Sequence, residues 1–191
     1  MRRDHVGARV LYLHTPGRMK FKALLFVSAL ATPAFADTNA KLSNDEVQTL
    51  QHVHHVNQME IDLAKVAQKA GSPAVQALAA EILKDHQQAD KDLMALAAKK
   101  KVTATTETSD DKQADKDMQK DVDHLKTLKG KDFDKEYASM MAEGHTKEIS
   151  KLDAAISSGS DTDVKGFLEK IKPNLQKHAD DAKQLAGKAN S

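Results

Sequence analysis

The chain has no cysteine and no tryptophan, and only 4% of its residues are aromatic. Without cysteine there is no disulfide, no thiol nucleophile and no residue for lipid attachment, so a lipoprotein is excluded. Only four prolines and eight glycines interrupt 191 residues. Ala, Leu, Lys, Asp and Gln are abundant, which is typical of helices that pack through aliphatic side chains and argues against a β-sandwich.

Several signatures of chemistry and of membrane insertion are also absent. No stretch approaches the ~20 consecutive apolar residues that a membrane-spanning helix needs, so we expect no transmembrane segment in the mature protein. The sequence contains no Gly-x-Ser-x-Gly elbow, phosphate-binding glycine loop or zincin motif, and no Glu-x-x-His pair of the di-iron type. The sequence therefore gives no support for an enzyme, and ferroxidase or oxygenase chemistry is disfavoured.

The amino-terminal segment has the pattern of a cleavable signal peptide. Basic residues at 18–22 precede an apolar run at 23–31, and an Ala-x-Ala cleavage site ends at Ala36. We predict a signal peptide over residues 19–36, cleaved after Ala36, and a mature protein that is periplasmic or secreted. Residues 1–18 precede a complete signal and are predicted to be a non-native upstream extension.

The charge balance of the mature chain argues against nucleic acid as a partner. The whole chain has a formal charge of +1, and removing residues 1–36 takes away six basic residues and one acidic residue, which leaves −4. Charges of both signs alternate along the sequence and form no basic stripe. A protein partner is compatible with this pattern, and the oligomeric state is open.

Capping residues divide the mature chain into five predicted helices. Ser43 and Glu46 form a Ser-x-x-Glu capping box, Gly71 is predicted as a left-handed C-cap, and Ser72-Pro73 begins the next helix. The long helices are expected at residues 44–71, 73–101, 132–158 and 161–186, with a shorter connector helix at 109–130. Two hairpins joined by a crossover predict an all-α, ferritin-like antiparallel four-helix bundle over residues 44–186, with tails at 37–43 and 187–191.

Each long predicted helix carries an apolar stripe at alternating three- and four-residue steps, the pattern that faces a bundle core. One polar residue interrupts each stripe close to the middle of the bundle. These residues are Glu60, His86, His145 and His178. A buried polar group without a partner is costly, so four of them on facing helices are predicted to satisfy one another or to share an ion.

Two interpretations of these four residues stay open. Three imidazoles and one carboxylate suit a divalent metal such as Zn, Cu, Mn or Fe, and the nearby Met59 and Met141 would suit copper. Alternatively, the side chains form a metal-free hydrogen-bond network that fixes the register of the bundle, with Asp85, Asp181 or Glu148 as partners.

A second group of histidines lies on the first predicted helix. His52 and His55 are one helical turn apart and could hold a metal together, with His54 between them. Histidines exposed on the surface are the simpler interpretation, and we favour it.

The sequence resembles an exported bacterial family with a ferritin-like domain of unknown function, DUF4142, often labelled predicted outer membrane protein. The resemblance spans about residues 44–186. It rests on Glu60 with residues 63–67, Asp85-His86, the segment Gly130–Tyr137, His145, and Pro173 with His178. The family implies a ferritin-like fold and an envelope location, and it implies no established activity.

Three functions remain in competition. The first is an exported bundle that binds a divalent metal at its centre for storage, sensing or protection. The second is a non-enzymatic envelope-stress or protein-interaction module whose polar core is structural. The third is a redox or hydrolytic enzyme, which would need an open coordination position on the metal and a substrate pocket.

Overall fold

The computed structural model describes residues 41–106 and 109–189. The predicted upstream extension, signal peptide and cleavage site lie outside this part of the chain. Five α-helices and no strand occur in it, which confirms the all-α prediction. The helices are α1 (Asn44–Ala70), α2 (Pro73–Lys100), α3 (Ser109–Thr127), α4 (Gly130–Ser158) and α5 (Thr162–Ala189).

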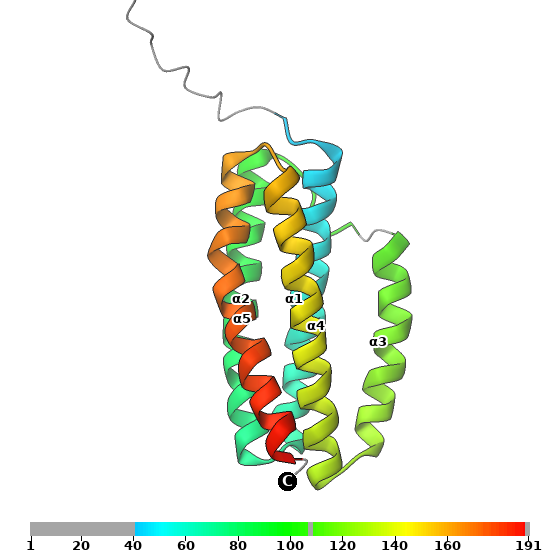
Figure 1. Cartoon of the computed structure of the whole chain (residues 1–191). Helices are drawn as coiled ribbons and strands as arrows, with labels where there is room; N and C mark the ends of the chain where they lie inside the picture. The colour runs from blue at the N-terminus through cyan, green and yellow to red at the C-terminus, as the bar shows by residue number, and fades with distance from the viewer. Residues whose placement is uncertain (1–40, 107–108, 190–191) are drawn as a thin grey trace, which may run out of the picture. The chain divides into compact units, whose positions relative to one another are not determined.

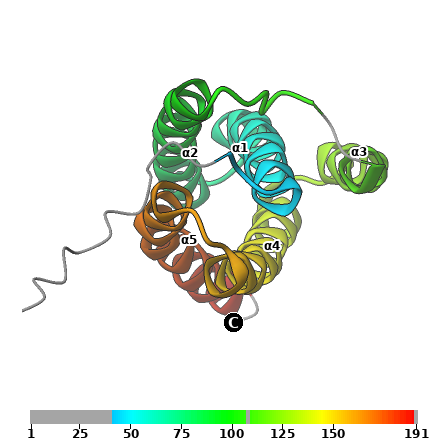
Figure 2. The same cartoon turned by 90° about the horizontal axis from the view of Figure 1, so that it is seen from above.

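The four long helices form an antiparallel bundle and α3 lies outside it (Figure 1). Seen from above, α1, α2, α5 and α4 follow one another around the bundle, and α3 stands beside α1 and α4 (Figure 2). The hairpins α1–α2 and α4–α5 make the closest contacts. Because α3 returns along the length of the bundle, α2 and α4 run in the same direction.

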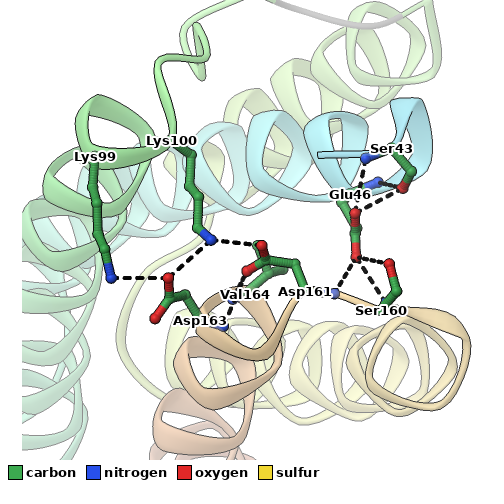
Figure 3. Close-up of polar contacts among 8 residues, drawn as sticks. All are labelled: Ser43, Glu46, Lys99, Lys100, Ser160, Asp161, Asp163 and Val164. Carbon is green, nitrogen blue, oxygen red and sulfur yellow. Dashed lines mark hydrogen bonds and ion pairs between the residues drawn. The ribbon is translucent and has the colours of Figure 1, made fainter. Parts of the chain in front are cut away.

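The predicted capping box at the start of α1 is present and also joins two hairpins. Glu46 Oε2 accepts hydrogen bonds from the backbone N–H and the hydroxyl of Ser43, and Ser43 Oγ accepts from Glu46 N–H. Glu46 Oε1 accepts from the backbone N–H groups of Ser160 and Asp161 at 2.8 and 2.7 Å (Figure 3). Burial opposes ionisation, but these backbone donors hold the pKa of Glu46 at about 2.

Ion pairs fix the same end of the bundle from the side of α2. Lys100 Nζ lies 2.5 Å from Asp161 and 2.9 Å from Asp163, and Lys99 also pairs with Asp163 (Figure 3). Both lysines lie at the carboxyl-terminal end of α2, where the helix dipole is negative, and beside the amino-terminal end of α5. This joins α2 to α5 across the hairpins.

The predicted left-handed cap at Gly71 is wrong, because Gly71 has φ −76° and ψ 164°. Space explains the glycine: a Cβ at this position would lie 2.4 Å from Val75 Cγ1 and 2.9 Å from the carbonyl oxygen of Ala67. Ser72 precedes a proline and is also extended, which favours an extended turn. The left-handed cap occurs instead at Lys101, where φ is 57°.

Two apolar clusters fill the bundle, one toward each end, and they leave a polar layer between them. The first includes Leu50, Leu93, Leu152, Leu168 and Ile171. The second includes Leu63, Ile82, Leu125, Phe133 and Tyr137. In the described residues, none of the helices combines the length and apolar character that crossing a bilayer requires.

Candidate metal centre

Three histidines from three helices meet in the polar layer. His86 of α2, His145 of α4 and His178 of α5 are 3%, 2% and 0% exposed. His145 Nε2 lies 3.4 Å from His86 Nε2 and 3.3 Å from His178 Nδ1. One nitrogen from each ring therefore faces a common point, and all three atoms lie within 4.8 Å of one another.

The opposite nitrogen of each ring faces an oxygen atom. His145 Nδ1 donates to the carbonyl oxygen of Met141 at 2.9 Å, and His178 Nε2 donates to Asp85 Oδ2 at 3.2 Å. His86 Nδ1 lies 2.9 Å from Asn57 Oδ1 and donates to it. A carbonyl or carboxylate oxygen can only accept, so these contacts place the imidazole proton on the outer nitrogen. When the rings are neutral, their inner nitrogens carry lone pairs.

Three lone pairs that face one another have no donor between them, and their spacing suits a cation. Tetrahedral coordination with metal–nitrogen bonds of about 2.0–2.1 Å separates two ligand nitrogens by about 3.3–3.4 Å. The two shortest distances in the trio are 3.3 and 3.4 Å. A direct hydrogen bond is ordinarily shorter, at about 2.7–3.2 Å. Both distances suit the coordination of a divalent metal ion.

Electrostatics also keeps two of these rings neutral. Burial, and then the neighbouring His145 and His178, lower the pKa of His86 to about 3. Burial and His145 lower the pKa of His178, while Asp85 opposes this effect. Since a metal binds the neutral imidazole, both rings are ready to act as ligands at neutral pH.

Glu60, the fourth predicted ligand, lies on the other side of His145. Its Oε1 is 3.9 Å from His145 Nδ1, the nitrogen that points away from the other rings. The structure therefore brings together three of the four predicted residues and places Glu60 behind one of them. Burial raises the pKa of Glu60, and burial together with Glu60 raises the pKa of Tyr137. In the described residues, Glu60 Oε2 and the Tyr137 hydroxyl have no hydrogen-bond partner.

A small crevice between α2 and α5 reaches the trio. Its volume is about 10 Å³, and its lining includes Asp85, His86, Asn174 and His178. This is room for about one water molecule. Asp85, with a side chain 22% exposed, stands between His178 and solvent. Glu81 and Asp85 also lie within reach of His178, so carboxylates lie at this side of the site.

Sequence reasoning missed Asn57, which is 2% exposed and holds His86. A signal for it was available, because Leu50, Val53, Asn57, Glu60, Ala64 and Ala67 form a second regular stripe on α1. Asn57 interrupts this stripe one turn before Glu60. The alternating three- and four-residue spacing of this second stripe is the signal in the sequence that points to Asn57.

Two histidines of the predicted surface cluster, His52 and His54, have carboxylate partners. His52 Nδ1 and Nε2 each lie 2.9 Å from a carboxylate, that of Asp111 on α3 and that of Glu148 on α4. His54 Nδ1 lies 2.6 Å from Asp90 on α2. Both ring nitrogens of His52 therefore have partners, and this ring is not available as a metal ligand in this conformation.

Comparison with known proteins places the chain in a family. Its sequence matches the family model described as Domain of unknown function (DUF4142) over residues 31–185. No curated protein and no solved structure matches the chain. The family model covers most of the sequence and includes all the residues of the histidine trio. The chain therefore belongs to the DUF4142 family.

Proposed function

We propose that the protein binds one divalent metal ion at mid-bundle through His86 Nε2, His145 Nε2 and His178 Nδ1. The observation that carries the proposal is the orientation of the three rings: each outer nitrogen has an oxygen acceptor, and each inner nitrogen faces the same point. Acceptors behind ligand histidines are a common feature of metal sites, where they fix the tautomer and make the ligand more basic.

The charges around the trio suit a divalent cation. Asp85 contacts His178 and Glu60 lies beside His145, so two carboxylates lie next to the trio. Together they would balance a charge of +2. We assign Glu60 this balancing role and no direct bond to the metal, because it lies beside the outer nitrogen of His145. A metal would also lower the cost of ionising Glu60 in its buried position.

The donor set favours particular metals. Neutral imidazoles suit Zn, Cu and Fe, whereas Mn prefers oxygen ligands. Three protein ligands leave a fourth coordination position, and a small crevice lies beside two of the ligands, His86 and His178. An exchangeable metal in an exported bundle fits storage, sensing or protection. Chemistry at the fourth position would require a substrate site larger than this crevice.

Isothermal titration of the metal-free protein with Zn, Cu, Mn and Fe ions tests the proposal. We expect saturation at one equivalent with Zn or Cu, and no saturable binding by a His86→Ala, His178→Ala double variant. Glu60→Gln should retain the stoichiometry with weaker affinity, which separates an outer charge from a ligand. If the wild type binds none of the four ions, the trio is a structural network, and the alternative of a non-enzymatic envelope-stress or protein-interaction module stands.

A further inference from the structure

Helix α3 is held to the bundle near both of its ends. Near its start, Asp111 is 1% exposed and its carboxylate lies 2.9 Å from His52 Nδ1 of α1. Near its end, Leu125 is fully buried in the apolar cluster that contains Phe133 and Leu63. Between these points α3 stands away from the four-helix bundle, as both views show (Figures 1 and 2). Met118 and Val122 in the middle of α3 line a hollow.

Two adjoining hollows occupy this space. The larger has a volume of about 600 Å³ and is lined by Met59, Asp62, Leu63, Val66, Lys116, Met118, Gln119, Val122 and Lys126. The smaller has a volume of about 230 Å³ and is lined by Lys65, Val66, Lys69, Ala70, Leu125, Lys126, Leu128 and Phe133. Val66 and Lys126 line both, so the two hollows form one groove between α1 and α3.

The lining of the groove combines apolar side chains with an excess of lysines. In the larger hollow the single acidic residue, Asp62, pairs with Lys65 Nζ at 2.9 Å, and the basic residues are Lys116 and Lys126. In the smaller hollow all the charged residues are lysines, namely Lys65, Lys69 and Lys126. Asp123 lies 3.7 Å from Lys126 Nζ, and Lys126 lines both hollows of the groove.

We propose that this groove binds a single-chain anionic amphiphile, a long-chain carboxylate, with its head group at Lys69 and Lys126. Its chain would lie along Met59, Val66 and Met118, where unbranched methionine side chains adapt to a flexible ligand. The volume is in the range of about 300–1,000 Å³ that is typical of small-molecule sites. Charge complementarity selects an anionic head group over a cationic one.

The test uses dodecanoate, below its micelle concentration, and measures binding to the purified protein by isothermal titration. We expect saturable binding at one equivalent, weaker binding of dodecanol, and the weakest binding of dodecyltrimethylammonium, which has the same chain with a cationic head. A Lys69→Glu, Lys126→Glu variant should bind dodecanoate at least about tenfold more weakly, since charge-assisted contacts are replaced by repulsion. Both lysines are exposed, so the fold should survive.

A matched control and a second variant make the result decisive. Lys84→Glu changes the same charge on the exposed surface of α2, outside the groove, and should leave binding unchanged. Met118→Glu places a charge against the chain and should abolish binding, while circular dichroism checks that helicity is retained. Equal binding of the three amphiphiles, insensitivity to the lysine variant, or a groove closed by self-association in sedimentation would overturn the proposal. A variant without the histidine trio should bind dodecanoate normally.

Discussion

His86 at the centre of the bundle and His52 between α1, α3 and α4 differ in what faces their ring nitrogens. Both nitrogens of His52 lie within hydrogen-bond distance of a carboxylate, which favours the protonated ring, and Lys151 Nζ also lies 3.2 Å from Nε2. The hydrogen bond to Glu148 raises the pKa of His52, although burial opposes it, and Asp111 adds to the increase. His86 has an amide oxygen on one side and another histidine on the other, and its pKa is about 3.

The difference shows that hydrogen-bond partners, and not burial alone, set the direction in which the pKa of a buried histidine shifts. Desolvation lowers the pKa of both rings, yet only His52 has carboxylates within hydrogen-bond distance of both nitrogens. A cationic ring can tie helices together, as His52 does for α1, α3 and α4. A neutral ring with a free lone pair can bind a metal. The chain therefore uses one residue type for attachment at its edge and, in the proposed site, for coordination at its centre.

The largest effect should come from removing a ligand. Metal at about a thousand times its Kd should raise the free energy of unfolding of the wild type by about 4 kcal/mol. His145→Ala should show no such increase, because one converging nitrogen is lost. His124→Ala, on the exposed surface of α3, should respond like the wild type. Urea unfolding with and without metal measures both, and an equal increase in the His145→Ala variant would contradict the assignment.

Changing the acceptor behind a ligand should weaken the site without destroying it. Asp85→Asn and Asn57→Ala remove the partners of His178 and His86, and we expect affinity to fall by about 10–100-fold. Asp90→Asn, which changes the partner of His54, provides the control. Competition with a chelator measures the Kd. Unchanged affinity in Asp85→Asn would show that the tautomer of His178 is fixed in another way.

The pH dependence of the metal-free protein should report the neutral state of His86. Its folded pKa of about 3 lies below the ordinary value of 6.5, so between these values the unfolded chain binds more protons. Stability is then complete above pH 6.5 and falls as the pH drops, by about 1.4 kcal/mol per pH unit for one group. His86→Asn should show a shallower slope between pH 6.5 and 5 in urea unfolding. An identical slope would mean that His86 is protonated in the folded state.

His52 should give a smaller effect of opposite sign. Its folded pKa is raised, so its contribution is present below pH 6.5 and is lost as the pH rises through the folded value. Its side chain is 25% exposed, and solvent limits the contribution to about 1 kcal/mol or less. Amide exchange of α3 should accelerate in His52→Gln at pH 6 and not in His54→Gln. Equal exchange in the two variants would remove His52 as the attachment of α3.

The sequence predicted much of the bundle because heptad stripes and caps are local patterns. The interruptions at His86, His145 and His178 were visible for the same reason, since each helix places its stripe in the core. The pattern could not predict which side of His145 Glu60 occupies. Helical spacing places Glu60 in the core, but it does not show which ring nitrogen of His145 the carboxylate approaches. Asp111 lies in a polar connector without periodicity, so its contact with His52 depends on how α3 returns along the bundle. The conformation of Gly71 could not be predicted either, because a glycine is needed there to make room for Val75 and not to form a left-handed turn.

The most direct test of the metal centre is the metal content of the protein, purified without an affinity tag or chelator and analysed by mass spectrometry. The account predicts close to one equivalent of a divalent metal in the wild type and none in His86→Ala or His178→Ala. Wild-type protein that stays free of metal, even after incubation with Zn, Cu, Mn and Fe ions, would contradict it and leave the three histidines as a structural network.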